Sequence, residues 1–194
     1  MNKNYTYKST EEKWFGWYLD ELKEYGLIED YTYEEVTFTL APKQTFKYDK
    51  QLKTKVKSVE KILFRPLTYT PDFVINFETK ATSIANLPHK FPLFITSNST
   101  LTAYIDIKGG FGNKASDIRF PDKQKMMYHL HRIYVNKIEI EANPGKQSNI
   151  FKETFLPKKI IEECVYLKDC QWGKKGESKI KYKYRTIEEW IKTL

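Results

Sequence analysis

Residues 102–110 read T-A-Y-I-D-I-K-G-G and carry the pattern that decides the fold. The segment alternates as a β-strand does, so Asp106 and Lys108 leave one face while the flanking isoleucines, Ile105 and Ile107, pack on the other. The strand rise places the two charged side chains roughly 7 Å apart along the strand. A carboxylate and an ammonium group therefore share one exposed edge of the predicted sheet.

A second carboxylate stands at the start of another apolar strand. Residues 70–75 read T-P-D-F-V-I, with the proline where its missing N–H removes no ladder hydrogen bond. Asp72 and Asp106 on neighbouring strands would form an oxygen-rich site that suits Mg²⁺ better than Zn²⁺. Lys108 would orient or help deprotonate a water, or neutralise charge on a phosphate. The pattern predicts metal-assisted hydrolysis of a phosphodiester, although D-x-K alone is more often a surface ion pair on an ordinary strand.

Composition limits the class of protein. The 194 residues suit one domain with a substantial core, and 40% hydrophobic and 15% aromatic residues exclude global disorder. The net charge of +8 favours a polyanionic partner. Cys164 and Cys170 fit neither a disulfide scaffold nor a zinc knuckle, so a reducing compartment is expected. Without a membrane-spanning run or a signal-peptide core, we expect a soluble cytoplasmic protein with no membrane partner, in the host cytoplasm if phage-encoded.

The clearest predicted helix covers residues 9–25. Ser9 and Glu12 have the spacing of a capping box, and Gly26 stands where a C-terminal cap belongs. Glu12 has two interpretations. It either serves only as a capping residue, or it lies against the sheet and supplies a further metal or water ligand.

A lysine-rich stretch follows at residues 43–61. Its K-T-K-V-K-S-V portion alternates like one arm of a hairpin, which would place Lys53, Lys55 and Lys57 on one face. Such a face could contact phosphates, and a solvated hairpin explains it equally well. Residues 78–100 then form a long connection, which is uncommon unless functional or inserted.

The next helix is expected to begin at Pro121 and run to about residue 132. Gln124 and Tyr128 lie four residues apart on one face, where an amide and a phenol could bind DNA phosphates or order the lysine, with Lys125 adding a cation. A partly buried helix edge gives the same pattern.

A second basic stretch lies near the C-terminus. Cations alternate there with Ile and Tyr, so a strand would have a cationic face suited to a phosphate backbone. An edge strand protected by lysines looks the same in sequence. The cations are Lys179, Lys181, Lys183 and Arg185. A strand at 134–140 and short helices at 157–163 and after Thr186 complete the predicted elements.

The order of helix, Pro-Asp strand, D-x-K strand and following helix over residues 9–135 resembles the PD-(D/E)xK nuclease superfamily. The T-P-D-F and Y-I-D-I-K-G motifs look most like small phage-borne endonucleases of the Holliday-junction-resolvase type. The resemblance implies an α/β fold, with a central mixed sheet flanked by helices in a restriction-endonuclease-like core. Residues 1–140 would form this core, and residues 141–194 a β-rich basic accessory extension packed on it, unless both form a single domain.

The resemblance also implies a site and an activity. Asp72 and Asp106 would bind the metal, Mg²⁺ or Mn²⁺, with Ile107 included in the metal site. Lys108 would position or activate the water, and Glu12 would be the helix-borne acid. Gln124 and Tyr128 match a Q-x-x-x-Y element of some branches. The expected function is a Mg²⁺-dependent endodeoxyribonuclease acting on branched or structured DNA in phage recombination or replication. The alternatives are a catalytically inactive nuclease-fold module that binds nucleic acid or protein, and a basic structural protein. A homodimer would allow paired cuts, but no stretch marks an interface.

Overall fold

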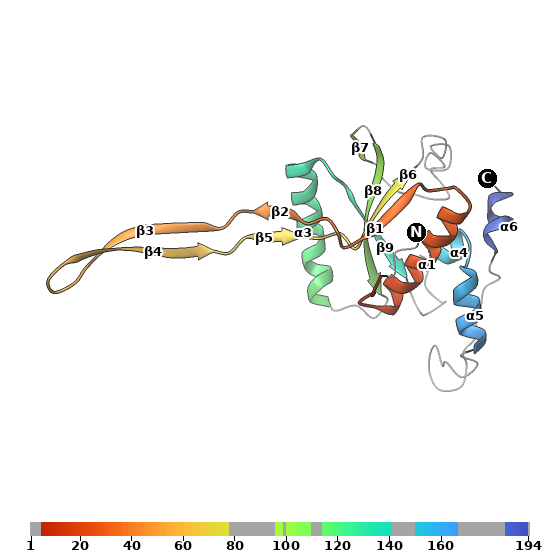
Figure 1. Ribbon diagram of the computed structural model, residues 1–194, viewed down its shortest axis with the longest axis horizontal. Coiled ribbons are helices and arrows are strands. Elements are labelled where there is room, and N and C mark those ends of the chain that lie inside the picture. The colour runs from red at the N-terminus through yellow and green to blue at the C-terminus, as the bar shows by residue number, and fades with distance from the viewer. Residues whose placement is uncertain are drawn as a thin grey trace.

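A computed structural model describes residues 5–77, 96–98, 100–109, 114–140, 150–166 and 185–193 of the chain. Its centre is a mixed β-sheet with helices on both faces (Figure 1). The predicted α/β class with a mixed central sheet is therefore confirmed. Within the described residues, no helix is both long enough and apolar enough to cross a membrane.

Five strands form the central sheet among the described residues. They are β1 (Asp30–Tyr33), β6 (Phe73–Phe77), β7 (Thr96–Asn98), β8 (Thr100–Gly109) and β9 (Val135–Ile140). β6 pairs antiparallel with both β1 and β8, and β7 also pairs antiparallel with β8, whereas β9 runs parallel to β8. β8 is thus the central strand. The strand predicted from the alternation at 102–110 is confirmed, but the predicted exposed edge is wrong, because β8 is paired on both sides and Asp106 is buried.

The register of the sheet brings the two predicted acids to one level. Phe73, the first residue of β6, pairs with Ile105 of β8. Asp72 directly precedes Phe73, so it lies level with Asp106. Residues opposite each other in an antiparallel pair project from the same face, so both carboxylates leave the same side of the sheet.

The two faces of β8 contribute to two separate cores. Ile105 and Ile107 are buried in the larger core together with α1 (Thr10–Glu24). Tyr104, which leaves the other face, packs on a smaller core formed with α3 (Lys114–His131). The prediction that the isoleucines pack away from Asp106 is therefore confirmed, and Asp106 and Lys108 lie on the α3 side.

Helix α1 forms for the reasons given by its sequence. The Ser9 hydroxyl accepts a hydrogen bond from Glu12 N–H at 3.1 Å, and the helix ends before Gly26, which has a φ of +67°. The left-handed conformation at this position is one that glycine adopts without steric penalty. Phe15 and Tyr18 are fully buried, Phe15 against Phe73 of β6 and Tyr18 against Phe155, so the helix is fixed by its apolar face.

Helix α3 begins earlier than predicted. It starts at Lys114 rather than at Pro121, which lies inside the helix. The start was predicted at Pro121 because proline is favoured at the first position of a helix. Phe120 and Met127 anchor α3 through the smaller core.

The first basic stretch forms a β-hairpin, here called the arm, that extends away from the rest of the molecule (Figure 1). Its strands are β3 (Gln44–Gln51) and β4 (Val56–Phe64), and the short pair β2 (Phe38–Ala41) and β5 (Leu67–Tyr69) connects it to the body. The hairpin is as predicted, but Lys53 and Lys55 are not on a strand face with Lys57. They lie in the turn, where Leu52 N–H donates to the Lys55 carbonyl at 2.8 Å.

Three helices of the C-terminal region pack on the same core as α1. They are α4 (Ile150–Glu153), α5 (Lys158–Tyr166) and α6 (Ile187–Ile191). The helix predicted after Thr186 is α6, and Thr186 and Glu189 form a capping box at its start. The described part of the extension is thus helical, whereas the predicted basic strand with Lys179, Lys181 and Lys183, like most of the 78–100 connection, lies outside the described residues.

Candidate active site

The candidate site is the junction of β5, β6 and β8, where Asp72 meets Asp106. The Asp72 Oδ2 accepts a hydrogen bond from Ile107 N–H at 2.6 Å. Asp106 is 4% exposed, and its Oδ1 accepts a hydrogen bond from the Tyr69 hydroxyl at 2.9 Å. Two acids 34 positions apart in the sequence are therefore held together by main-chain and side-chain contacts.

Lys108 lies beside this pair. Its ammonium group forms an ion pair with Asp106 Oδ2, and it is 5.5 Å from the ring centroid of Phe120 on α3. The Lys108 side chain is 19% exposed, so it is accessible from solvent while resting against the protein. A cation is thus fixed next to the carboxylates, as the D-x-K spacing predicted.

The electrostatics of Asp72 reflect this crowding. Burial, followed by the negative charge of Asp106, raises the pKa of the Asp72 carboxyl to about 7 from its ordinary 3.8. The hydrogen bond from Ile107 N–H and the charge of Lys108 act in the opposite direction. Two neighbouring carboxylates that repel each other form a site that a bound cation would stabilise.

The residues fit a hard divalent cation. Asp106 accepts from the Tyr69 hydroxyl through Oδ1 and pairs with the Lys108 ammonium through Oδ2. Because a carboxylate has about four lone pairs, it could still bind a cation. No group of three or more His, Cys, Asp or Glu side chains converges in the described part of the chain. Mg²⁺ is nevertheless commonly held by one or two carboxylates together with waters and substrate phosphates. Asp72 and Asp106 would supply those carboxylates, whereas the side chain of Ile107 is buried in the core.

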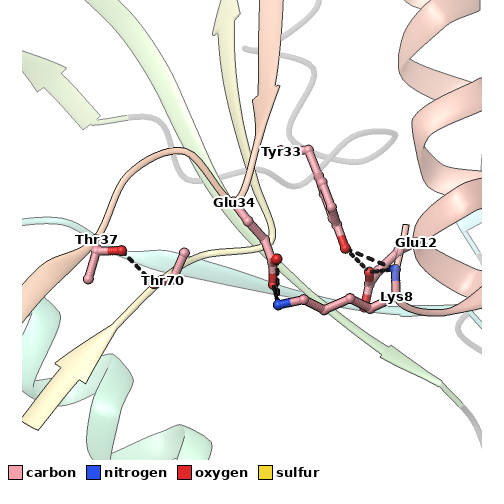
Figure 2. A network of polar contacts seen from close by, with 6 residues as sticks. All are labelled: Lys8, Glu12, Tyr33, Glu34, Thr37 and Thr70. Atoms are coloured by element: carbon pink, nitrogen blue, oxygen red, sulfur yellow. Dashed lines mark hydrogen bonds and ion pairs between the residues drawn. The ribbon is translucent and has the colours of Figure 1, made fainter. Parts of the chain in front are cut away.

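Glu12 lies in a neighbouring polar network. Figure 2 shows its carboxylate against the Tyr33 hydroxyl and the backbone of Lys8, whose N–H donates to Glu12 Oε2 at 3.0 Å. The Lys8 ammonium in turn forms an ion pair with Glu34. Glu12 is near enough to contribute to the raised pKa of Asp72. Its carboxylate accepts from the N–H of Lys8, one residue before the N-cap Ser9, and from the Tyr33 hydroxyl, so the reciprocal bond of the predicted capping box is not made.

Glu12→Gln separates the two interpretations of this residue. Because glutamine keeps an acceptor for Lys8 N–H, we expect the melting temperature to change little and DNA cleavage to fall less than about tenfold. The measurement is cleavage rate with Mg²⁺ alongside thermal unfolding. A loss of about a thousandfold at unchanged stability would instead make Glu12 a third metal ligand.

A hollow of about 520 Å³ adjoins this network. It is lined by Tyr5, Tyr7, Lys8, Ser9, Thr10, Lys13 and Trp17. Lys8 links the hollow to the acids: its pKa is raised chiefly by Glu34, with smaller contributions from Glu12 and Asp72. Aromatic, hydroxyl and ammonium groups of the N-terminal segment and α1 thus line this hollow.

The remaining predicted binding residues have varied environments. The Gln124 amide donates to the Val135 carbonyl at 2.6 Å, which ties α3 to β9. Lys125 and Tyr128 are exposed on α3, Tyr128 by 53%. The Arg185 guanidinium donates to the main-chain carbonyl of Glu153. Gln124 and Arg185 therefore make internal contacts. For Gln124 this agrees with the partly buried helix edge that the sequence left open, whereas for Arg185 no such contact was predicted.

Tyr69 is the site residue that sequence reasoning missed. It lies at the end of β5, is buried, and its hydroxyl binds Asp106 as described above. Its only signal in the sequence is its position three residues before Asp72, which says nothing about Asp106. Lys123 of α3 lies above the Tyr69 ring at 5.5 Å.

Comparisons with known protein families, curated proteins and solved structures yielded no match to this chain. The site and the fold therefore carry the functional argument without support from relatives.

Proposed function

We propose that this protein is a metal-dependent endonuclease that hydrolyses phosphodiester bonds in DNA, with branched or otherwise structured DNA as its substrate. The observation that carries the proposal is the meeting of Asp72 and Asp106 on one side of the sheet, with Lys108 paired to Asp106. Three residues of a spaced motif occupy one location.

Each residue has a distinct role in this proposal. Asp72 and Asp106 would hold Mg²⁺ or Mn²⁺, which supplies Lewis-acid polarisation of the phosphate and of a water molecule. The Lys108 ammonium, already paired with Asp106, donates hydrogen bonds to the scissile phosphate or the attacking water and offsets developing negative charge. The water oxygen bonds to phosphorus as the bond to the leaving sugar oxygen breaks. The proton of the water passes to solvent, and the leaving oxygen takes up a proton from solvent to become a hydroxyl.

The experiment is a cleavage assay with purified protein. Supercoiled plasmid and a synthetic four-way junction are incubated with Mg²⁺, Mn²⁺ or EDTA, and the products are resolved on gels. We expect cleavage with either metal, none with EDTA, and faster cleavage of the junction than of a linear duplex of equal length. Absence of cleavage of every substrate would overturn the proposal, and metal-independent, salt-sensitive DNA binding alone would define a binding module instead.

Tyr69→Phe tests the positioning of Asp106. The change removes one hydrogen bond to a carboxylate and retains the ring, so we expect cleavage to fall by about 10 to 100-fold. The free energy of unfolding should fall by about 1 kcal/mol. The Mg²⁺ concentration for half-maximal cleavage should rise, because the Asp106 carboxylate is less well oriented. Tyr104→Phe, which removes a hydroxyl on the same side of the sheet from a ring that packs on Phe38, is the control.

A further inference from the structure

The arm is exposed along its whole length. Every residue of β3 is exposed, as is every residue of β4 except Val59. Eight residues of strand span roughly 26 Å, and Figure 1 shows this ribbon projecting beyond the body of the protein. A lone two-stranded hairpin is at best marginally stable in water, so a partner that binds the arm would also stabilise it.

The two faces of the arm differ in chemistry. Tyr48 pairs with Val59, and Lys50 pairs with Lys57, so these side chains project from one face. This surface, here called the cationic-aromatic face, consists of Phe46, Tyr48, Lys50, Lys57, Val59 and Lys61. It carries three lysines and no acid. The opposite face has one lysine, Lys47, against the two acids Asp49 and Glu60.

The charge of the arm is not neutralised internally. Residues 43–67 contain eight basic and two acidic residues, a net +6 of the chain's +8. No lysine of the arm forms an ion pair within the described residues. Lys50 and Lys57 are directly opposite each other, an arrangement that destabilises a hairpin. An anionic partner would convert this repulsion into binding energy.

The aromatic rings specify the kind of anion. Phe46 and Tyr48 are 54% and 39% exposed, with ring centroids 6.0 Å apart and planes 16° apart. Proteins that bind single-stranded nucleic acids combine cations along the phosphates with aromatic rings on which bases stack. The bases of a duplex are stacked on one another, so they cannot use these rings.

We propose that the cationic-aromatic face binds an unpaired stretch of DNA, with Lys50, Lys57 and Lys61 at the phosphates and Phe46 and Tyr48 stacked on bases. This inference rests on the proposed nuclease function and adds to it. It names DNA with unpaired nucleotides as the substrate class, and it separates the substrate-binding surface from the site of hydrolysis.

The test measures binding without cleavage. A fluorescein-labelled mixed-sequence single strand and a blunt duplex of equal length are titrated in EDTA and followed by anisotropy at several salt concentrations. We expect the single strand to bind more tightly than the duplex. Phe46→Leu with Tyr48→Leu should weaken single-strand binding roughly 30-fold and remove the preference, because leucine retains apolar contact but loses the ring.

A matched control removes two apolar side chains from the opposite face. Val56→Ala with Ile62→Ala alters residues that are 57% and 50% exposed, and single-strand binding should remain within about twofold of wild type. Lys50→Gln with Lys57→Gln should lower the salt slope of binding by about 1.4 while leaving or raising the melting temperature. That combination of effects cannot arise from unfolding of the arm.

Two results would overturn the inference. One is equal affinity of the face variants and the wild type for single strands. The other is a wild-type dimer that dissociates in the Phe46 and Tyr48 variant while DNA binding is unchanged, which would make a second copy the occupant of the face. The proposed function can fail separately. If no substrate is cut but binding of single-stranded DNA in EDTA depends on this face, only the nuclease proposal is overturned. If cleavage occurs and the face variants bind normally, only this inference falls.

Discussion

Asp106→Asn is expected to abolish Mg²⁺-dependent DNA cleavage while leaving the fold in place. The asparagine oxygen still accepts the hydrogen bond from Tyr69, but the negative charge that would bind the metal and that pairs with Lys108 is lost. Loss of a charged ligand at the reacting centre removes several kcal/mol of transition-state stabilisation, so the single-turnover cleavage rate should fall at least about a thousandfold.

The same chemical change at Asp30 provides the control. Asp30 pairs with Asn76 of β6, at the opposite end of that strand from Asp72, and forms an ion pair with Lys23. Asp30→Asn should cleave at the wild-type rate with a melting temperature close to that of wild type. If Asp106→Asn retained cleavage with unchanged metal dependence, the carboxylate pair would not be the hydrolytic site. Single-strand binding in EDTA should be equal in all three proteins.

Local sequence patterns were sufficient to predict the structure where the burial or backbone conformation of a residue can be satisfied in only one way. The alternation around Asp106 could be predicted because Ile105 and Ile107 have to be buried, which fixes the face of their neighbours. The Ser9 cap and the glycine at 26 similarly determine the ends of α1. These are short-range preferences that tertiary contacts reinforce.

Other elements depend on contacts that no local pattern shows. β1, with the sequence D-Y-T-Y, was not predicted, because its tyrosines at 31 and 33 are buried by residues distant in the sequence, among them Phe73 of β6. The turn of the arm was misplaced because pairing of Gln51 with Val56 leaves Lys53 and Lys55 unpaired. Tyr69 could not be assigned to the site, because its bond to Asp106 joins residues 37 positions apart. The convergence of Asp72 on Asp106 was inferred from a motif, and the register of β6 on β8 gives it a physical basis.

Asp72→Asn is expected to change the pH dependence of stability, as well as to eliminate cleavage. The pKa of Asp72 is about 7 in the folded protein, and its ordinary value is 3.8. Between these two pH values Asp72 is protonated in the folded protein and ionised in the unfolded chain. The free energy of unfolding therefore falls as pH rises from about 4 to about 7, and this contribution is constant above that range. The full shift corresponds to about 4 kcal/mol.

Asparagine does not titrate and still accepts the Ile107 hydrogen bond, so this pH-dependent loss should disappear. Chemical denaturation between pH 4 and pH 8 should show the Asp72→Asn protein gaining stability relative to wild type by up to about 4 kcal/mol across that range. At pH 8, Mg²⁺ should raise the melting temperature of wild type, whose two ionised carboxylates repel each other, and should have no effect on the variant. At Mg²⁺ concentrations well below saturation, wild-type cleavage should rise about tenfold per pH unit below pH 7 and level off above it, because the Asp72 carboxyl must lose its proton to bind the metal. A variant whose stability follows the wild-type pH curve, or that responds equally to Mg²⁺, would show that Asp72 neither titrates in this range nor binds the metal.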